Sequence, residues 1–223
     1  MTQLEVLRAP HVPRLLASGV IGRIPSAIAA LAAGLVMRDA GLGYHLVGWA
    51  VGAFGAGLAV GGPFLGRIVD RRGQSRVLVA SSLVAAAAFV LVDLADDRWP
   101  LIVVAMAVAG FATPPLEPCL RALWPDLVDD DDLDAALSLD AATQELVFII
   151  GPTLVAAAAA VINPEAAVWM AALLGVLGAI TFARTAPSQA WEPHDDAGAD
   201  ESHWLGPLQS KGLVLLFVCL LFQ

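Results

Sequence analysis

The apolar residues of this chain gather in six long runs, and a short polar stretch separates each run from the next. A helix needs about 20 apolar residues to cross the roughly 30 Å of hydrocarbon in a bilayer. Each run comes near that length, so the pattern predicts six membrane-spanning helices. The predicted helices cover residues 15–37, 46–68, 77–94, 101–123, 135–162 and 166–183.

The stretches between the runs carry the signals of tight turns. Residues 39–43, 71–73 and 96–100 contain glycine, aspartate or proline, and Asn163-Pro164 separates the last two runs. Short connections make neighbouring helices antiparallel. We therefore expect an all-α integral membrane fold, a six-helix bundle whose two ends lie on the same side of the membrane.

Composition supports a membrane protein. Hydrophobic residues make up 58% of the chain, charged residues make up 15%, and the mean hydropathy is +0.76. This is more apolar than a soluble domain of this length requires for its core. The acidic residues occur mostly in loops between apolar runs, so the net charge of −9 indicates no nucleic-acid partner. The sequence contains no phosphate-binding loop, nucleophile motif or metal-ligand cluster. We therefore do not expect an enzyme, and we expect no bound cofactor and no metal site.

Basic residues predict the orientation of the bundle, because loops rich in Lys and Arg stay on the cytoplasmic side. The side that contains the turn at residues 66–76 carries most of them, whereas Arg38 and Arg98 fall on the opposite side. We expect a multi-pass protein of the plasma membrane with a cytoplasmic N-terminus. The residues that favour this orientation are Arg8, Arg14, Arg67, Arg71, Arg72, Arg76, Arg121, Arg184 and Lys211.

The composition changes after the six-helix region at residues 1–184. Residues 185–210 are rich in Pro, Asp, Ser and Trp and are predicted to form an acidic cytoplasmic linker. Another apolar run begins within residues 211–223, but about eleven residues cannot cross a bilayer as a helix. We expect this run to be the truncated start of a seventh helix, so that the same chain or another one supplies further helices.

Charged residues and prolines interrupt two of the apolar runs. An ionisable side chain at hydrocarbon depth is costly, so each one is a candidate functional residue. Arg23 lies well inside the first run, close to Pro25, and we expect it to face inward toward a partner or a substrate. In the fourth run Pro114, Pro115 and Pro118 are too close together to leave the helical hydrogen bonds intact. The freed carbonyl groups are tolerated only against protein or a water-filled cavity.

Polar residues of the fourth and fifth runs are expected to face each other. Glu117 and Arg121 lie four residues apart and share a helix face, as do Asp140 and Gln144. The two runs are antiparallel, so Arg121 and Asp140 should lie at a similar depth. We predict an Arg121–Asp140 ion pair with Glu117 and Gln144 above it. This group is either a substrate or ion-coupling site or a static network that locks the bundle.

Glu145 lies roughly 140° around the helix from Asp140, so it should face a different neighbour. Carboxyl groups at membrane depth are candidate proton carriers, which suggests H+ or another coupling ion. Glu117 and Glu145 both qualify, and the sequence does not choose between them.

The six runs divide into two triplets, in which the first and fourth runs hold corresponding positions. Both of these runs carry charged residues and proline. Transporters built from inverted repeats place their substrate sites at such interrupted helices near the membrane midplane. The pattern therefore predicts a transporter of small molecules, with a cavity lined by Arg23, Glu117 and their neighbours.

The loop between the second and third runs contains the motif Gly66-x-x-x-Asp70-Arg71-x-Gly73-x-x-Arg76. In position and spacing it resembles the loop signature of major facilitator superfamily transporters. This resemblance implies twelve helices in two six-helix halves that work by alternating access. It covers the N-terminal half, the linker and the start of helix seven. It also implies that Asp70 holds the cytoplasmic gate against a helix of the second half, and that Arg71 and Arg76 complete the charge network.

Two further stretches are similar to sequences of this family. Gly151-Pro152 in the fifth run resembles the core of its antiporter motif, although Val155-Ala156 stands where two glycines are expected. We count Gly151 and Pro152, together with Pro25 and the prolines of the fourth run, as candidate helix hinges. The stretch from Arg121 to Pro125, followed by Ser138-Leu139-Asp140, is similar to actinobacterial members of the family.

Three functions follow from the sequence. The first is ion-driven export of small organic molecules. The second is uptake of a small metabolite. The third is a half-transporter that acts only with a partner chain.

Overall fold

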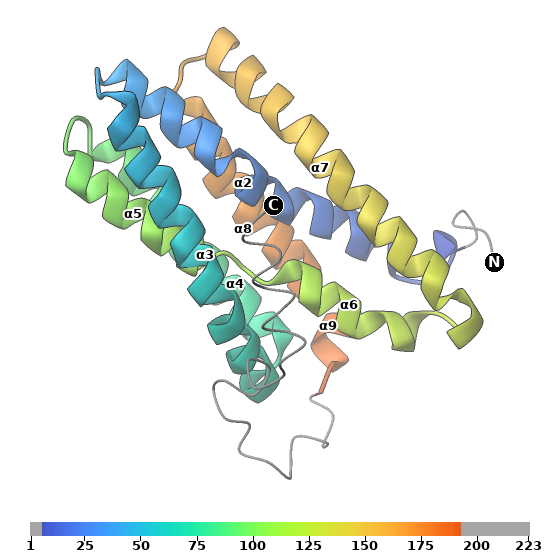
Figure 1. Cartoon of the computed structure of the whole chain (residues 1–223). Coiled ribbons are helices and arrows are strands. Elements are labelled where there is room, and N and C mark those ends of the chain that lie inside the picture. Colours follow the sequence, from blue (N-terminus) through green and yellow to red (C-terminus); the bar gives the residue numbers. More distant parts are fainter. Residues whose placement is uncertain (1–5, 193–223) are drawn as a thin grey trace, which may run out of the picture. The chain divides into compact units, whose positions relative to one another are not determined.

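The structure, a computed structural model, describes residues 6–192. In this range the chain folds entirely into helices and their connections, without a strand (Figure 1). The elements are α2 (Val12–Asp39), α3 (Tyr44–Arg72), α4 (Gln74–Leu94), α5 (Trp99–Phe111), α6 (Leu116–Leu127), the 3-10 helix η1 (Asp130–Asp132), α7 (Leu133–Val161), α8 (Ala166–Ala183) and α9 (Ala186–Ala190).

Six helical stretches of the described range are long and apolar enough to cross a membrane, as predicted. The fourth of them consists of α5 and α6 together, and the fifth consists of η1 and α7. Several helices extend beyond the apolar runs into polar turns, because the last turn of a helix no longer needs an apolar surface at the membrane edge. The chain is therefore a multi-pass membrane protein.

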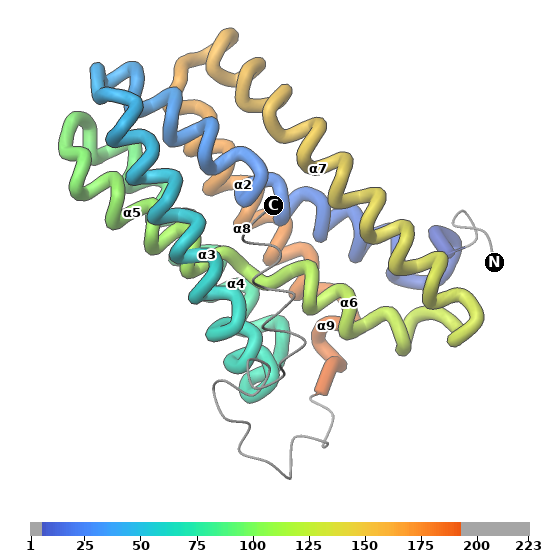
Figure 2. Tube along the Cα trace, in the orientation of Figure 1, coloured from blue at the N-terminus to red at the C-terminus, as the bar shows by residue number. Residues whose placement is uncertain are grey.

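Helix packing reveals two inverted repeats of three helices. α2 packs against α7 and α8, while α5 packs against α3 and α4. The first triplet of spans is α2, α3 and α4, and the second triplet is α5–α6, α7 and α8. When each helix is replaced by the helix at the same position in the other triplet, the contacts of α2 with α7 and α8 become the contacts of α5 with α3 and α4. α4 and α8 hold the third position of their triplets, and they pack against each other. This arrangement, which can be followed in Figure 2, confirms the predicted bundle of two three-helix repeats.

Burial is uneven among the helices. Only 17% of the most apolar part of α3 and of α7 is buried, compared with 44% to 56% in the other four spans. α3 and α7 are the second members of their triplets. They leave large apolar side chains exposed, including Trp49 and Phe64 on α3 and Phe148 and Ile149 on α7.

α3 and α5 approach each other closely through glycine. A side chain at Gly57 or Gly61 would meet the backbone of Ala107 or Phe111 on α5. A side chain at Gly110 would in turn meet the backbone of Phe54. The absence of side chains at these positions lets the two backbones come into contact.

The helix α9 occupies the beginning of the expected linker. It packs against α4, α6 and α8, and its Ser188 is buried. The expected linker from residue 193 onward and the seventh apolar run lie outside the described residues.

Candidate functional site

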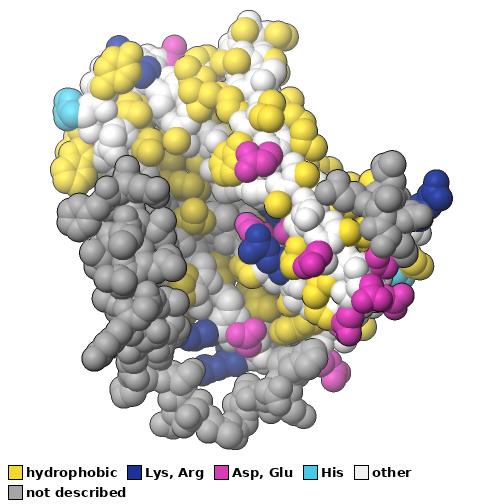
Figure 3. All heavy atoms as spheres, turned by 45° about the vertical axis from the view of Figure 1, so that its right-hand side comes forward, with side chains coloured by type: hydrophobic (Ala, Val, Ile, Leu, Met, Phe, Trp, Pro, Cys, Tyr) yellow, Lys and Arg dark blue, Asp and Glu magenta, His cyan; other side chains and the backbone are white. Residues whose placement is uncertain are grey.

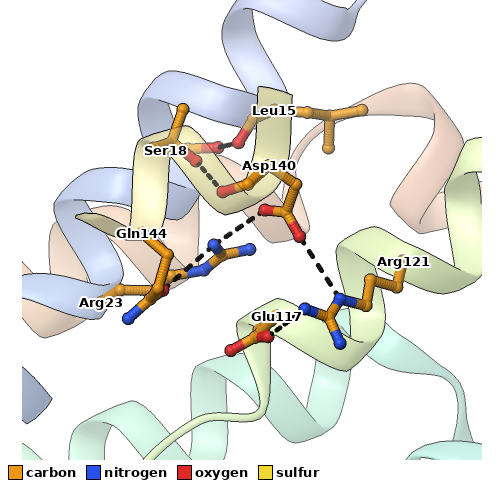
Figure 4. A network of polar contacts seen from close by, with 8 residues as sticks. Leu15, Ser18, Arg23, Glu117, Arg121, Asp140 and Gln144 are labelled. Atoms are coloured by element: carbon orange, nitrogen blue, oxygen red, sulfur yellow. Dashed lines mark hydrogen bonds and ion pairs between the residues drawn. The ribbon is translucent and has the colours of Figure 1, made fainter. Parts of the chain in front are cut away.

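A buried ion pair joins α2 to α7. Nη1 of Arg23 donates to Oδ1 of Asp140 at 2.8 Å and to Oε1 of Gln144 at 3.3 Å (Figure 4). The side chains of Arg23 and Asp140 are only 6% and 2% exposed. Asp140 and Gln144 lie four residues apart, so α7 presents both of them to α2. Nε and Nη2 of Arg23 are buried without a hydrogen-bond partner among the described residues.

Arg121 extends this pair onto α6. Its Nε donates to Oδ2 of Asp140 at 3.4 Å, and its Nη2 lies 2.6 Å from Oε1 of Glu117. The side chains of Arg121 and Glu117 are 55% and 39% exposed. Two arginines and two carboxylates thus alternate in a chain, which we call the charge network, that runs from the buried end at Arg23 to the open end at Glu117.

The predicted Arg121–Asp140 ion pair is confirmed, and Glu117 and Gln144 flank it. The sequence also placed Arg23 inward, but it did not identify Asp140 as its partner. The two residues lie on α2 and α7, which are not consecutive, so no short connection fixes their relative depth. Because Arg23 is buried, the open surface of the charge network is formed by Glu117 and Arg121.

The exposed end of the network belongs to a helical stretch that is long and apolar enough to span a membrane. Glu117 and Arg121 belong to the spanning stretch Trp99–Leu127. Acidic and basic side chains gather in a hollow of the largely apolar face shown in Figure 3. Charged groups at this depth are costly against lipid. The open end of the network therefore needs water or protein beside it.

Glu145 lies apart from the charge network. It is exposed on α7, next to the exposed Leu146, and it makes no ion pair with another described residue. The structure thus separates the two candidate proton carriers. Glu117 contacts a basic partner, whereas Glu145 has an open surface in front of it.

The predicted interruption of the fourth span is confirmed. α5 ends at Phe111 and α6 begins at Leu116, with Pro114 and Pro115 between them. Pro115 has no N–H to donate to the carbonyl of Phe111, which lies four residues before it. Pro118 lies in the first turn of α6, where a helix tolerates proline because the N–H groups there have no helical partner.

The other candidate hinges lie inside continuous helices. α2 passes through Pro25 without a break, and α7 passes through Gly151 and Pro152. Gly151 faces the side chain of Ile28 on α2, and Gly175 of α8 faces the ring of Pro25. These residues contribute to helix packing, and their role as hinges stays a prediction.

The motif between the second and third spans forms the turn between α3 and α4. Gly73 has φ +83°, a conformation that favours glycine, and its N–H donates to the carbonyl of Val69 at 2.8 Å. Gly66 lies about 1.7 turns of helix before Arg72, in an open part of α3. The side chains of Asp70, Arg71 and Arg76 are exposed.

Two residues that the motif leaves unspecified fix this turn to the bundle. The buried Gln74 donates from Nε2 to the carbonyl of Cys119 on α6 at 3.2 Å. Oγ of Ser75 lies 3.0 Å from the carbonyl of Ala183 and 3.2 Å from that of Ser188. Sequence reasoning missed both residues. A glutamine and a serine in the first turn of a helix are common on exposed surfaces, so their type carried no signal.

No group of three or more His, Cys, Asp and Glu side chains in residues 6–192 is arranged to hold a metal ion.

Comparison with known families supports a transport function. The sequence model of the Major Facilitator Superfamily matches residues 15–223. A search of curated proteins found no match.

Proposed function

The chain belongs to the Major Facilitator Superfamily of small-molecule transporters, and from this premise we propose that it exports small organic molecules by alternating access, driven by an ion gradient. The proposed location is the plasma membrane, with the N-terminus in the cytoplasm. Uptake of a metabolite is the opposite direction of the same process.

The charge network is the observation that carries this proposal. It places Arg121 and Glu117, both partly exposed, inside a membrane-spanning stretch. Ionisable residues at this depth commonly mark substrate and ion pathways. The exposed end is the part that a substrate reaches, while the buried Arg23–Asp140 pair holds the site to α2 and α7.

Glu117 is the carboxylate that we assign to proton coupling. It is 39% exposed and lies 2.6 Å from the Arg121 guanidinium, so a proton from water can reach it and its charge controls Arg121. Protonation of Glu117 would weaken its ion pair with Arg121. The arginine would then be free to contact a substrate.

Export can be tested with ethidium in cells that produce the chain. After loading without an energy source, cells that receive glucose should lose the dye faster than cells with the empty vector. Glu117→Gln and Arg121→Gln should each slow this loss by about tenfold, which corresponds to one charge-assisted interaction. Glu165→Gln, outside the network at the start of α8, should behave like the unchanged chain. Equal rates for all variants would contradict the proposal, and inward movement of a radiolabelled metabolite would support uptake.

A half-transporter that works with a second six-helix half is the alternative. The exposure of α3 and α7 supports this arrangement, because the helices with the least burial are those that another half could cover. The second half belongs to the same or another chain. Crosslinking of Phe148→Cys on α7 to a partner in native membranes, followed by mass spectrometry, would identify it.

A further inference from the structure

A cavity of about 620 Å³ lies between α3 and α4, next to the end of α5. It is separate from the charge network. Most of its wall is apolar, and the two charged groups in the wall are both basic. The lining residues that matter here are Arg72, Arg76, Ala80, Val84 and Phe111.

The cavity exists because the fourth span is interrupted. α5 packs against both α3 and α4, but α6 packs mainly against α2 and α7. Beyond Phe111 the chain therefore leaves the line of α5, and α6 keeps contact with α4 at Gln74, whose side chain donates to the carbonyl of Cys119. The space that a continuous helix would fill stays open.

The two arginines lie at one end of the cavity. Arg72 is the last residue of α3, and Arg76 lies in the first turn of α4. Both are exposed, and neither forms an ion pair with another residue of the range 6–192. Two basic side chains in the wall of one cavity attract an anionic group with several oxygen atoms.

The apolar wall of the cavity is nearly as long, measured along α4, as the acyl chain of a lipid. From Arg76 to Val84 along α4 the helix rises by about 12 Å, at 1.5 Å per residue. One leaflet contributes about 15 Å of hydrocarbon. The cavity thus begins at the membrane edge with positive charge and continues to about the level of the bilayer centre with apolar side chains.

We propose that this cavity binds an anionic phospholipid of the leaflet on the side of the α3–α4 turn. The lipid phosphate contacts Arg72 and Arg76, and one acyl chain lies along Ala80 and Val84 toward Phe111. A free phosphate would use only the arginines, and a neutral lipid would use only the wall. Binding of this lipid is independent of the solute that the chain transports.

Native mass spectrometry of the full chain in detergent tests this proposal with phosphatidylglycerol and phosphatidylcholine. Phosphatidylglycerol should bind at least tenfold more tightly. Arg72→Gln should weaken its binding several-fold, and Arg72→Gln with Arg76→Gln on the order of tenfold or more. Arg14→Gln, which removes an exposed charge away from the cavity, is the matched control and should bind like the unchanged chain.

Ala80→Phe provides the second test, because it narrows the apolar part and leaves both arginines in place. It should weaken phosphatidylglycerol binding and leave the weak binding of glycerol phosphate unchanged. Monodisperse elution in detergent confirms that each variant is folded. Equal binding of the two lipids, full binding by the double arginine variant, or full binding by Ala80→Phe would each overturn the proposal.

Discussion

At Asp140, one buried carboxylate contacts arginines from two other helices. Oδ1 accepts from Arg23 and Oδ2 accepts from Arg121. Removal of one partner from a buried ion pair leaves the other charge without compensation, whereas an apolar replacement of both partners is often tolerated. The two ends of the charge network should therefore respond differently to mutation.

Asp140→Asn should destabilise the bundle by about 3 kcal/mol, because Arg23 would stay buried without a negative partner. The double variant Asp140→Leu with Arg23→Met should recover most of this loss. Glu117→Gln, at the exposed end, should cost about 1 kcal/mol or less because solvent screens its ion pair. Equilibrium unfolding in detergent measures all three. A loss for Asp140→Asn no larger than that for Glu117→Gln would contradict the central role of Asp140.

At the scale of elements, the contact between α3 and α5 depends on the absence of side chains. Gly61→Ala should destabilise the bundle by about 1–3 kcal/mol, because the added methyl group meets the Phe111 backbone. Gly62→Ala is the control, since nothing lies within 4 Å of its added methyl group. Alanine favours a helix over glycine by up to about 1 kcal/mol, so Gly62→Ala should be neutral or stabilising. Thermal unfolding in detergent compares the two, and similar melting temperatures would argue against the close contact.

The sequence predicts the elements well and their lateral contacts poorly. The apolar runs locate the six spans, because the membrane sets the length of a helix. The prolines before Leu116 locate the break. The Arg121–Asp140 pair follows from equal depth on consecutive helices. The Arg23–Asp140 pair and the Gln74 hydrogen bond join helices that are distant in the chain, and no local pattern specifies such neighbours.

At the scale of the whole molecule, the orientation in the membrane can be tested with single cysteines. In a chain with Cys119 and Cys219 replaced by alanine, Asp97→Cys should react with a membrane-impermeant maleimide added to intact cells. Asp131→Cys should react only after the cells are opened. Asp97 lies in the turn after α4, and Asp131 lies in η1 at the opposite end of the bundle. The reverse pattern would show that the N-terminus is outside.

The proposed gate at the α3–α4 turn makes a prediction for transport. Asp70→Asn should lower the rate of export on the order of tenfold, because it removes the charge that would contact the second half. The amount of protein in the membrane should stay the same, since Asp70 is exposed and Gln74 and Ser75 fix the turn. Asp97→Asn in the exposed turn after α4 is a control for charge alone. Unchanged export in Asp70→Asn would argue against the gate.

The break before Leu116 allows α6 to tilt independently of α5. Arg121 lies about 8 Å along α6 from the break, so a rotation of about 10° at the break moves it by roughly 1.4 Å. That displacement is enough to lose the 3.4 Å contact between Arg121 and Asp140. The 2.8 Å bond between Arg23 and Asp140 stays intact, because neither α2 nor α7 crosses the break. A small tilt of α6 can therefore separate Arg121 from Asp140 while the buried Arg23–Asp140 pair keeps its position.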